Sequence, residues 1–159
     1  GNCVAHEIDV LAQKDNITYF IEAKFHKSPS QRTDVRVALY IKSRYEDLKA
    51  NWKLGETQAW IVTNTRFSTD AIKYGECQNI RLTSWGYPKG EGIMDLIEHT
   101  GLHPVTIVDG MSAGDKMRLM NAGVVSCKQL LDPKNHSLLS HDFLQKILPQ
   151  LEQICQNHT

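Results

Sequence analysis

Three residues near the N-terminus have the types and the spacing that phosphodiester chemistry requires. Asp9 lies in one run of alternating polar and apolar residues, and Glu22 and Lys24 lie two residues apart in the next run. Two carboxylates can hold a divalent cation, which polarises a phosphate and lowers the pKa of its bound water. The ammonium group of Lys24 could orient or deprotonate that water and offset developing negative charge. The pattern therefore predicts a site for metal-assisted hydrolysis.

Alternation predicts that these residues lie on the two strands of a hairpin. The runs 6–12 and 17–24 both have a period of two, which is typical of β-strands. Asp15 and Asn16 between the runs tolerate the backbone of a tight turn.

A two-residue turn also fixes the register of the hairpin. Counting back along both strands places Asp9 opposite Glu22 and Glu7 opposite Lys24, with all four side chains on one face. Opposed side chains have Cβ atoms about 4.5–5.5 Å apart, and like charges at that separation destabilise a sheet. The two acids therefore need a compensating cation, which a divalent ion would provide. The same three residue types are also common as solvated or ion-paired surface groups, so the prediction depends on the hairpin.

The segments that follow predict a mixed β-sheet flanked by helices. A helix capped by Thr33 or Asp34 is expected first, then a buried strand over 58–63, a helix capped by Ser68 and a short strand over 80–82. The apolar stripe of the first helix comprises Ala38, Ile41, Tyr45, Leu48 and Trp52. Alternation of strands and helices after a hairpin is typical of an α/β fold.

A loop over 85–92 is expected to separate a core, residues 1–84, from a small C-terminal α-helical domain, residues 93–159. Helices in that domain are expected over 93–99, 112–121, 126–131 and 142–155. Residues 119–131 resemble part of a helix-hairpin-helix, in which helix N-terminal amides hold a DNA phosphate. The full glycine pattern of the DNA-binding versions is missing, which favours a structural helical appendage.

Two blocks of sequence carry a resemblance to a known family. The first reads Glu-Ile-Asp-Val-Leu-Ala over 7–12 and Tyr-Phe-Ile-Glu-Ala-Lys-Phe-His over 19–26, and the second covers 62–71. In this order they resemble the Mrr-type restriction endonucleases of the PD-(D/E)xK superfamily, over about residues 4–82. The resemblance implies a restriction-endonuclease-like mixed sheet of four or five strands, Mg²⁺ or Mn²⁺ as cofactor, and DNA as substrate.

The same resemblance implies a role for each site residue. Asp9 and Glu22 would be metal ligands together with the carbonyl of Ala23, and Lys24 would be the catalytic lysine. Ile8 replaces the proline of the family pattern. Related enzymes also carry an acidic residue on a helix ahead of the first strand. We expect the core to lack that upstream helix; either Glu7 is a partial substitute, or the helix lies upstream in the parent chain. The region 85–155 is similar to proteins in which a Mrr-like domain follows an ATP-cone domain, so an upstream ATP-cone domain is expected in the parent chain.

Further polar residues near the site are candidates for contacts with DNA. His26 and Gln31 follow the second strand and could contact a phosphate or a metal-bound water, or else be solvated loop residues. The candidates for contacts with the DNA backbone are Lys27, Arg32, Arg36 and Arg66. A solvated helix face is the alternative for Lys27, Arg32 and Arg36, and helix capping or a surface ion pair is the alternative for Arg66.

The composition limits the class of protein. The chain has 159 residues with 18 Lys and Arg against 18 Asp and Glu, so any DNA-binding surface must be a local patch. No run approaches the roughly 20 apolar residues of a membrane span, and no membrane partner is expected. Four widely spaced cysteines are atypical of a zinc site or a disulfide framework and suit the reducing cytoplasm.

The leading hypothesis is a metal-dependent endonuclease that cleaves DNA, with a nuclease specific for branched DNA as a variant. The rival hypothesis is a DNA-binding or regulatory module that retains the nuclease fold with little catalytic activity. A structural α/β domain without a metal effect is the third. Cleavage of both strands usually needs two active sites, so a homodimer is expected.

Overall fold

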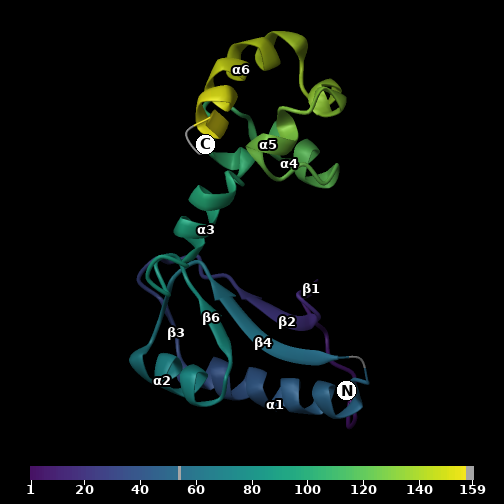
Figure 1. Ribbon diagram of the computed structural model, residues 1–159. Coiled ribbons are helices and arrows are strands. Elements are labelled where there is room, and N and C mark those ends of the chain that lie inside the picture. The colour runs from purple at the N-terminus through teal and green to yellow at the C-terminus, as the bar shows by residue number, and fades with distance from the viewer. Residues whose placement is uncertain (54, 157–159) are drawn as a thin grey trace. The chain divides into compact units, whose positions relative to one another are not determined.

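The computed structural model describes residues 1–53 and 55–156, and the chain divides into two compact units, residues 1–95 and 96–159. The division falls inside helix α3, Ile93–Thr100, rather than in the 85–92 loop (Figure 1). Residues 157–159 of the expected helical domain lie outside the described residues. In the described part of the chain, no helix combines the length and hydrophobicity that a membrane span requires.

The first unit contains a mixed four-stranded sheet, as the sequence predicts for an α/β fold. Its strands are β1 Val10–Lys14, β2 Ile17–Lys24, β4 Glu56–Thr63 and β6 Arg81–Thr83, in the order β1-β2-β4-β6. β1 is antiparallel to β2, and the other neighbours are parallel. Two short strands, β3 Arg32–Thr33 and β5 Arg66–Phe67, form a separate parallel pair that the sequence pattern does not predict.

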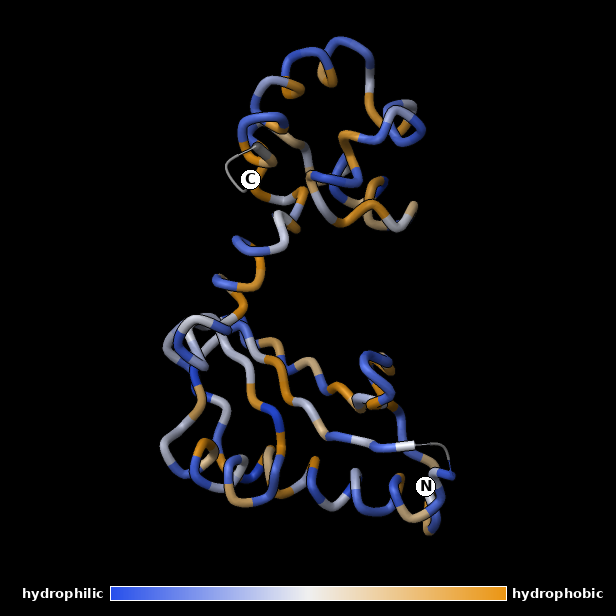
Figure 2. The backbone as a smooth tube through the Cα atoms, viewed as in Figure 1, coloured by the Kyte–Doolittle hydropathy of each residue, from blue (hydrophilic) through white to orange (hydrophobic). Residues whose placement is uncertain are grey.

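Two helices pack against one face of this sheet (Figure 1). Helix α1, Val35–Asn51, begins after Asp34, whose side chain accepts a hydrogen bond from the Arg36 amide. Helix α2, Thr69–Cys77, is capped in the same way by Ser68. Hydrophobic and hydrophilic residues alternate along α1 in Figure 2, as expected for a helix with one buried face. The buried core includes Phe20, Ala38, Ile41, Tyr45, Ala59, Ile61 and Leu82.

The predicted hairpin turn is confirmed, but the first strand begins later than expected. Asp15 and Asn16 have φ of 51° and 62°, as a type I′ turn requires. The ladder runs from the pair Lys14–Ile17 to the pair Val10–Ile21 and stops there. Asp9 therefore lies one step beyond the paired strand, at the position that continues the register toward Glu22.

The predicted position of Glu7 opposite Lys24 is wrong, because two side chains end the ladder. The Asp9 carboxylate accepts the hydrogen bond of the Ala23 amide, and the Arg44 guanidinium binds the Glu7 carbonyl. The backbone ahead of Asp9 consequently has partners outside the sheet.

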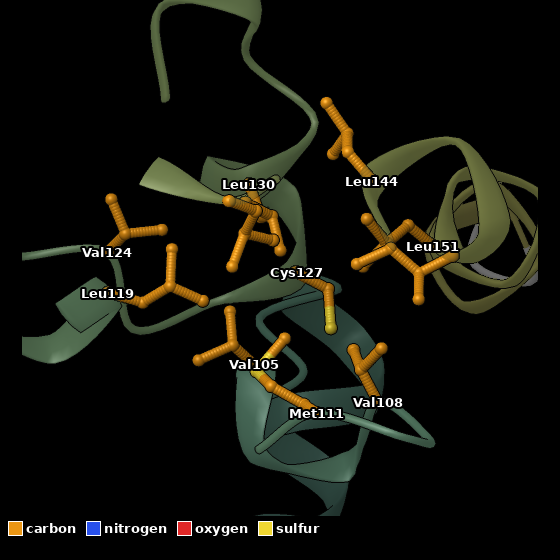
Figure 3. Close-up of a cluster of buried hydrophobic side chains, with 11 residues drawn as sticks. Val105, Val108, Met111, Leu119, Val124, Cys127, Leu130, Leu144 and Leu151 are labelled. Carbon is orange, nitrogen blue, oxygen red and sulfur yellow. The ribbon is translucent and has the colours of Figure 1, made fainter. Parts of the chain in front are cut away.

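The second unit is helical, with its own buried core (Figure 3). Its elements are η1 Val105–Ile107, α4 Ala113–Asn121, α5 Cys127–Leu130, η2 Pro133–Leu138 and α6 His141–Gln156. Ser112 and Ser126 cap α4 and α5, within the helices expected over 112–121 and 126–131, while the two 3-10 helices are not predicted. Leu119, Leu130 and Leu151 are fully buried at the centre of this core.

The backbone amides in the turn before α5 donate hydrogen bonds to side chains of the same turn and helix. The amides of Val125 and Ser126 both donate to Gln129 Oε1 at 3.0 Å, and the Gln129 amide donates to Ser126 Oγ at 3.2 Å. In a helix-hairpin-helix that binds DNA, amides of this region face a phosphate. The capping box supports the interpretation of this domain as a structural appendage.

Candidate active site

Asp9 lies at the open edge of β2, where β1 has ended. Its Oδ2 accepts a hydrogen bond of 2.8 Å from the Ala23 amide, and the side chain is exposed to solvent. The N–H and C=O groups of one strand residue point to the same side of the strand. The carbonyl of Ala23 therefore faces the edge at which Asp9 lies.

Glu22 is paired with a cation that the sequence analysis does not assign to the site. Arg44 Nη1 lies 2.9 Å from Glu22 Oε2, with the two side chains 14% and 21% exposed respectively. The same guanidinium donates to the backbone carbonyl of Glu7. The opposed carboxylates thus have their compensating charge from α1. The only sequence signal is the position of Arg44 beside Tyr45, at the border of the apolar stripe.

Two hollows meet at Glu22. One, of about 230 Å³, is lined by Ala5, His6, Glu7, Asp9, Glu22, Tyr40 and Arg44. The other, of about 350 Å³, is lined by Glu22, Lys24, His26, Gln31, Arg32, Asp34, Arg36, Val37 and Tyr40. The fold therefore gathers most of the predicted site residues around Glu22 and Tyr40. Lys27 is exposed outside both hollows, and Arg66 lines a separate one with Trp85 and Tyr87.

His26 is a buried residue, so its interpretation as a solvated loop residue is wrong. Its Nε2 lies 2.9 Å from Thr33 Oγ1, which in turn donates to Thr63 Oγ1 at 3.1 Å. Asn64 binds the backbone of His26 twice, accepting from its amide and donating to its carbonyl at 2.8 Å each. These bonds join the end of β2 to the ends of β3 and β4. They hold the chain immediately after Lys24.

The basic candidates differ in how free their charges are. Arg36 is ion-paired with Asp34, and that pairing holds the pKa of the Asp34 carboxyl below its usual range. Arg32 and Arg66 are exposed and lie opposite each other in the β3–β5 register. Within the described residues, neither of these two guanidinium groups has an ion-pair partner. An anion beside this pair would relieve the repulsion between like charges.

The oxygen atoms around Asp9 suit a hard divalent cation. Carboxylates and carbonyls are the ligands that Mg²⁺ prefers, and Mg²⁺ commonly keeps several waters beside one or two carboxylates. Over residues 1–53 and 55–156, no group of three His, Cys, Asp or Glu side chains has the geometry to hold a metal. An ion here would be held by Asp9, Glu22, the Ala23 carbonyl and water. Arg44 would have to share or release Glu22.

Comparison with known proteins places these features in a family. An uncharacterized protein of Archaeoglobus fulgidus is 43% identical over 138 residues, which are 87% of this chain and 76% of that protein. A crystal structure described as a protein of unknown function, AF1548, matches with a TM-score of 0.79 and 38% identity, covering 98% of this chain and 84% of that chain. Residues 103–155 match the family model described as AF1548-like, C-terminal.

Proposed function

The chain belongs to the AF1548-like family, and we propose that it is a metal-dependent endonuclease that hydrolyses phosphodiester bonds of DNA. The observation that carries the proposal is that Asp9 and Glu22 line one hollow at the open end of the hairpin, with Lys24 two residues further along β2. The mixed sheet supports, as a further part of the proposal, a restriction-endonuclease-like core.

Each site residue then has a defined task. Asp9, Glu22 and the Ala23 carbonyl would hold Mg²⁺ or Mn²⁺, and the ion would supply polarisation of the phosphate and a lowered pKa of the attacking water. Lys24, in the hollow on one side of Glu22, orients the attacking water and offsets negative charge on the phosphate. Asn64 keeps Lys24 in place through its two bonds to the His26 backbone.

The DNA backbone would lie along the hollow that contains Lys24. Arg32 and Gln31 line this hollow, and the exposed Lys27 and Arg66 lie on segments adjoining it in sequence or in the β3–β5 pair. Phosphate groups would supply the anions that Arg32 and Arg66 lack within the protein. We further propose a cytoplasmic location, which the four free cysteines suit, and a homodimer when both strands are cut.

The test is cleavage of supercoiled, linear and four-way-junction DNA by the purified protein with Mn²⁺ or Mg²⁺. We expect cleavage that is abolished by EDTA and by Lys24→Ala. Lys14→Ala is the matched control, because Lys14 is an exposed lysine at the far end of the same hairpin. Cleavage that survives Lys24→Ala or EDTA would contradict the proposal.

The Arg44–Glu22 ion pair favours one alternative, a DNA-recognition module that retains this fold with little hydrolysis. Glu22 already has a cation in this pair, so the carboxylate needs no metal for its stability. A recognition module would bind DNA without cleaving it, with equal affinity in EDTA and in Mn²⁺. The endonuclease requires the ion for cleavage.

A further inference from the structure

His6 is held in the hollow beside Asp9 and Glu22 by a carboxylate of α1. Its Nε2 lies 2.7 Å from Asp47 Oδ2, and the two side chains are 14% and 13% exposed respectively. Asp47 also accepts the amide of Cys3 at 2.6 Å. Hydrogen bonds from Cys3 and from His6 hold the pKa of the Asp47 carboxyl well below its usual range. Asp47 is therefore ionised near neutral pH.

This contact determines the tautomer of His6. An ionised carboxylate only accepts hydrogen bonds, so the shared proton is on Nε2. Within the described residues, the one buried side-chain N or O atom without a hydrogen-bond partner is Nε2 of His136. Nδ1 of His6 has no partner in the described residues either. Because it is not among the buried atoms without a partner, it is accessible to solvent. His6 lines the hollow of Asp9 and Glu22, and Nδ1 is its ring nitrogen that Asp47 does not bind.

Lys24 and His6 line different hollows that share Glu22. Lys24 lines the hollow of about 350 Å³ and His6 the hollow of about 230 Å³, and Glu22 belongs to both. In-line displacement at phosphorus places the attacking water and the leaving oxygen on opposite sides of the phosphate. With the scissile phosphate beside Glu22 and the water in the hollow of Lys24, the leaving sugar oxygen would lie in the hollow of His6.

We propose that His6 is the general acid of the reaction and that Asp47 is its positioning residue; the proposal rests on the proposed endonuclease function. The oxygen of the attacking water bonds to phosphorus and the water releases a proton to solvent, while the bond from phosphorus to the leaving sugar oxygen breaks. The leaving oxygen takes the Nδ1 proton of the His6 imidazolium and becomes a hydroxyl group. The neutral imidazole that remains keeps its Nε2 proton hydrogen-bonded to Asp47 and regains the Nδ1 proton from solvent.

A sulfur-substituted substrate separates this role from a structural one. His6→Gln keeps an amide N–H to donate to Asp47, but that amide is too weak an acid to transfer a proton. We expect the wild-type urea midpoint, an unchanged KM and Mn²⁺ affinity, and kcat lowered about 10²–10⁴-fold on ordinary DNA. DNA in which sulfur replaces the leaving oxygen needs little protonation. The variant should cleave that DNA within about tenfold of the wild-type rate, far closer than on ordinary DNA. The 3′ and 5′ termini of the DNA fragments that the wild type produces show whether the 3′ or the 5′ oxygen is the leaving oxygen, and that oxygen is the one to replace by sulfur.

Two results would overturn the role of His6 alone: cleavage of ordinary DNA by His6→Gln at the wild-type rate, or an equal loss on the sulfur substrate. A wild type that cleaves neither DNA overturns the endonuclease function and this role together.

If His6→Gln does not fold, the Asp47→Asn variant and an NMR measurement on the metal-free wild type still test the proposal. Asp47→Asn should lose kcat on ordinary DNA and regain it on the sulfur substrate. Long-range ¹H–¹⁵N spectra of the metal-free wild type should show neutral His6 protonated on Nε2. The Nδ1-protonated tautomer, or an Asp47→Asn variant with wild-type kcat on ordinary DNA, would refute the proposal.

Discussion

Arg44 and Glu22 form the ion pair that balances the charge at the open end of the hairpin, with Nη1 and Oε2 2.9 Å apart. Both side chains are more than three-quarters buried, so the pair is screened less by water than a surface pair. In the proposed endonuclease, a divalent ion bound at Glu22 would have to compete with the guanidinium. The affinity for that ion and the stability of the metal-free protein would therefore be coupled through Arg44.

Replacement of Arg44 by methionine tests this coupling. Arg44→Met keeps much of the aliphatic bulk and leaves Glu22 unpaired, so we expect the free energy of unfolding in EDTA to fall by about 1–3 kcal/mol. Mn²⁺ should raise the unfolding midpoint more in the variant than in the wild type. Urea denaturation with and without Mn²⁺ measures both effects.

The matched control for Arg44→Met is Arg36→Met. The Arg36 side chain is 86% exposed in its pair with Asp34, so we expect a change below about 1 kcal/mol. Equal losses in the two variants, or no extra response of Arg44→Met to Mn²⁺, would contradict the coupling.

The Asn64 side chain holds the backbone that follows Lys24 by hydrogen bonds. Asn64→Ala removes two hydrogen bonds to the His26 backbone, and we expect a loss of about 1–2 kcal/mol of unfolding free energy. DNA cleavage should also slow, because Lys24 is no longer held. Urea denaturation and single-turnover rates measure the two effects, with Asn121→Ala at an exposed position of α4 as control. Full stability together with full activity would rule out this role for Asn64.

Asp47 makes the unfolding free energy of the first unit depend on pH in the acidic range. Its folded pKa lies below the ordinary value of 3.8, so the ionised carboxylate contributes stability above that pH and loses it as the pH falls further. The difference in urea midpoint between wild type and Asp47→Asn should therefore be largest near pH 7 and shrink below about pH 4. The control is Asp142→Asn, whose side chain is fully exposed. A difference that is the same at every pH would exclude this linkage.

The two hydrophobic cores predict two separable unfolding transitions. Leu119 is fully buried in the second unit, so Leu119→Ala should cost about 2–5 kcal/mol there. The three tryptophans, Trp52, Trp60 and Trp85, all lie in the first unit. Their fluorescence transition should stay unchanged while the helical circular dichroism signal melts earlier. Met117→Ala, at a position of the same helix that is 64% exposed, should change neither. A shift of the fluorescence midpoint in Leu119→Ala would show that the units unfold together.

The hairpin register was predictable because it depends on local chemistry. The period of two and the positive φ of Asp15 and Asn16 are properties of adjacent residues, and they set the register from Lys14–Ile17 to Val10–Ile21. The point at which the ladder ends was not predictable. It depends on Arg44, which is 37 residues from Glu7 in the chain.

Burial of polar groups was beyond the sequence pattern for the same reason. His26 follows a polar strand end, and its sequence context is that of a loop. Its partners, Thr33 and Asn64, lie 7 and 38 residues away and depend on the β3–β5 pair forming. The tether of His6 to Asp47 spans 41 residues. Periodicity finds the strands, whereas these long-range polar contacts need the tertiary structure.

Arg32 and Arg66 provide a test in which stability and DNA affinity change in opposite directions. The two exposed arginines are directly paired in the β3–β5 register, and opposed like charges destabilise a sheet by about 0.2–1 kcal/mol. Arg66→Gln should therefore raise the unfolding free energy slightly. If a DNA phosphate binds beside the pair, the same variant should weaken DNA binding and reduce the slope of log K against log salt by about 1. Fluorescence anisotropy with labelled DNA at several salt concentrations measures the slope. Arg118→Gln, in the second unit and ion-paired with Asp115, should leave the slope unchanged. If Arg66→Gln keeps the wild-type slope, the DNA backbone does not pass over this arginine pair.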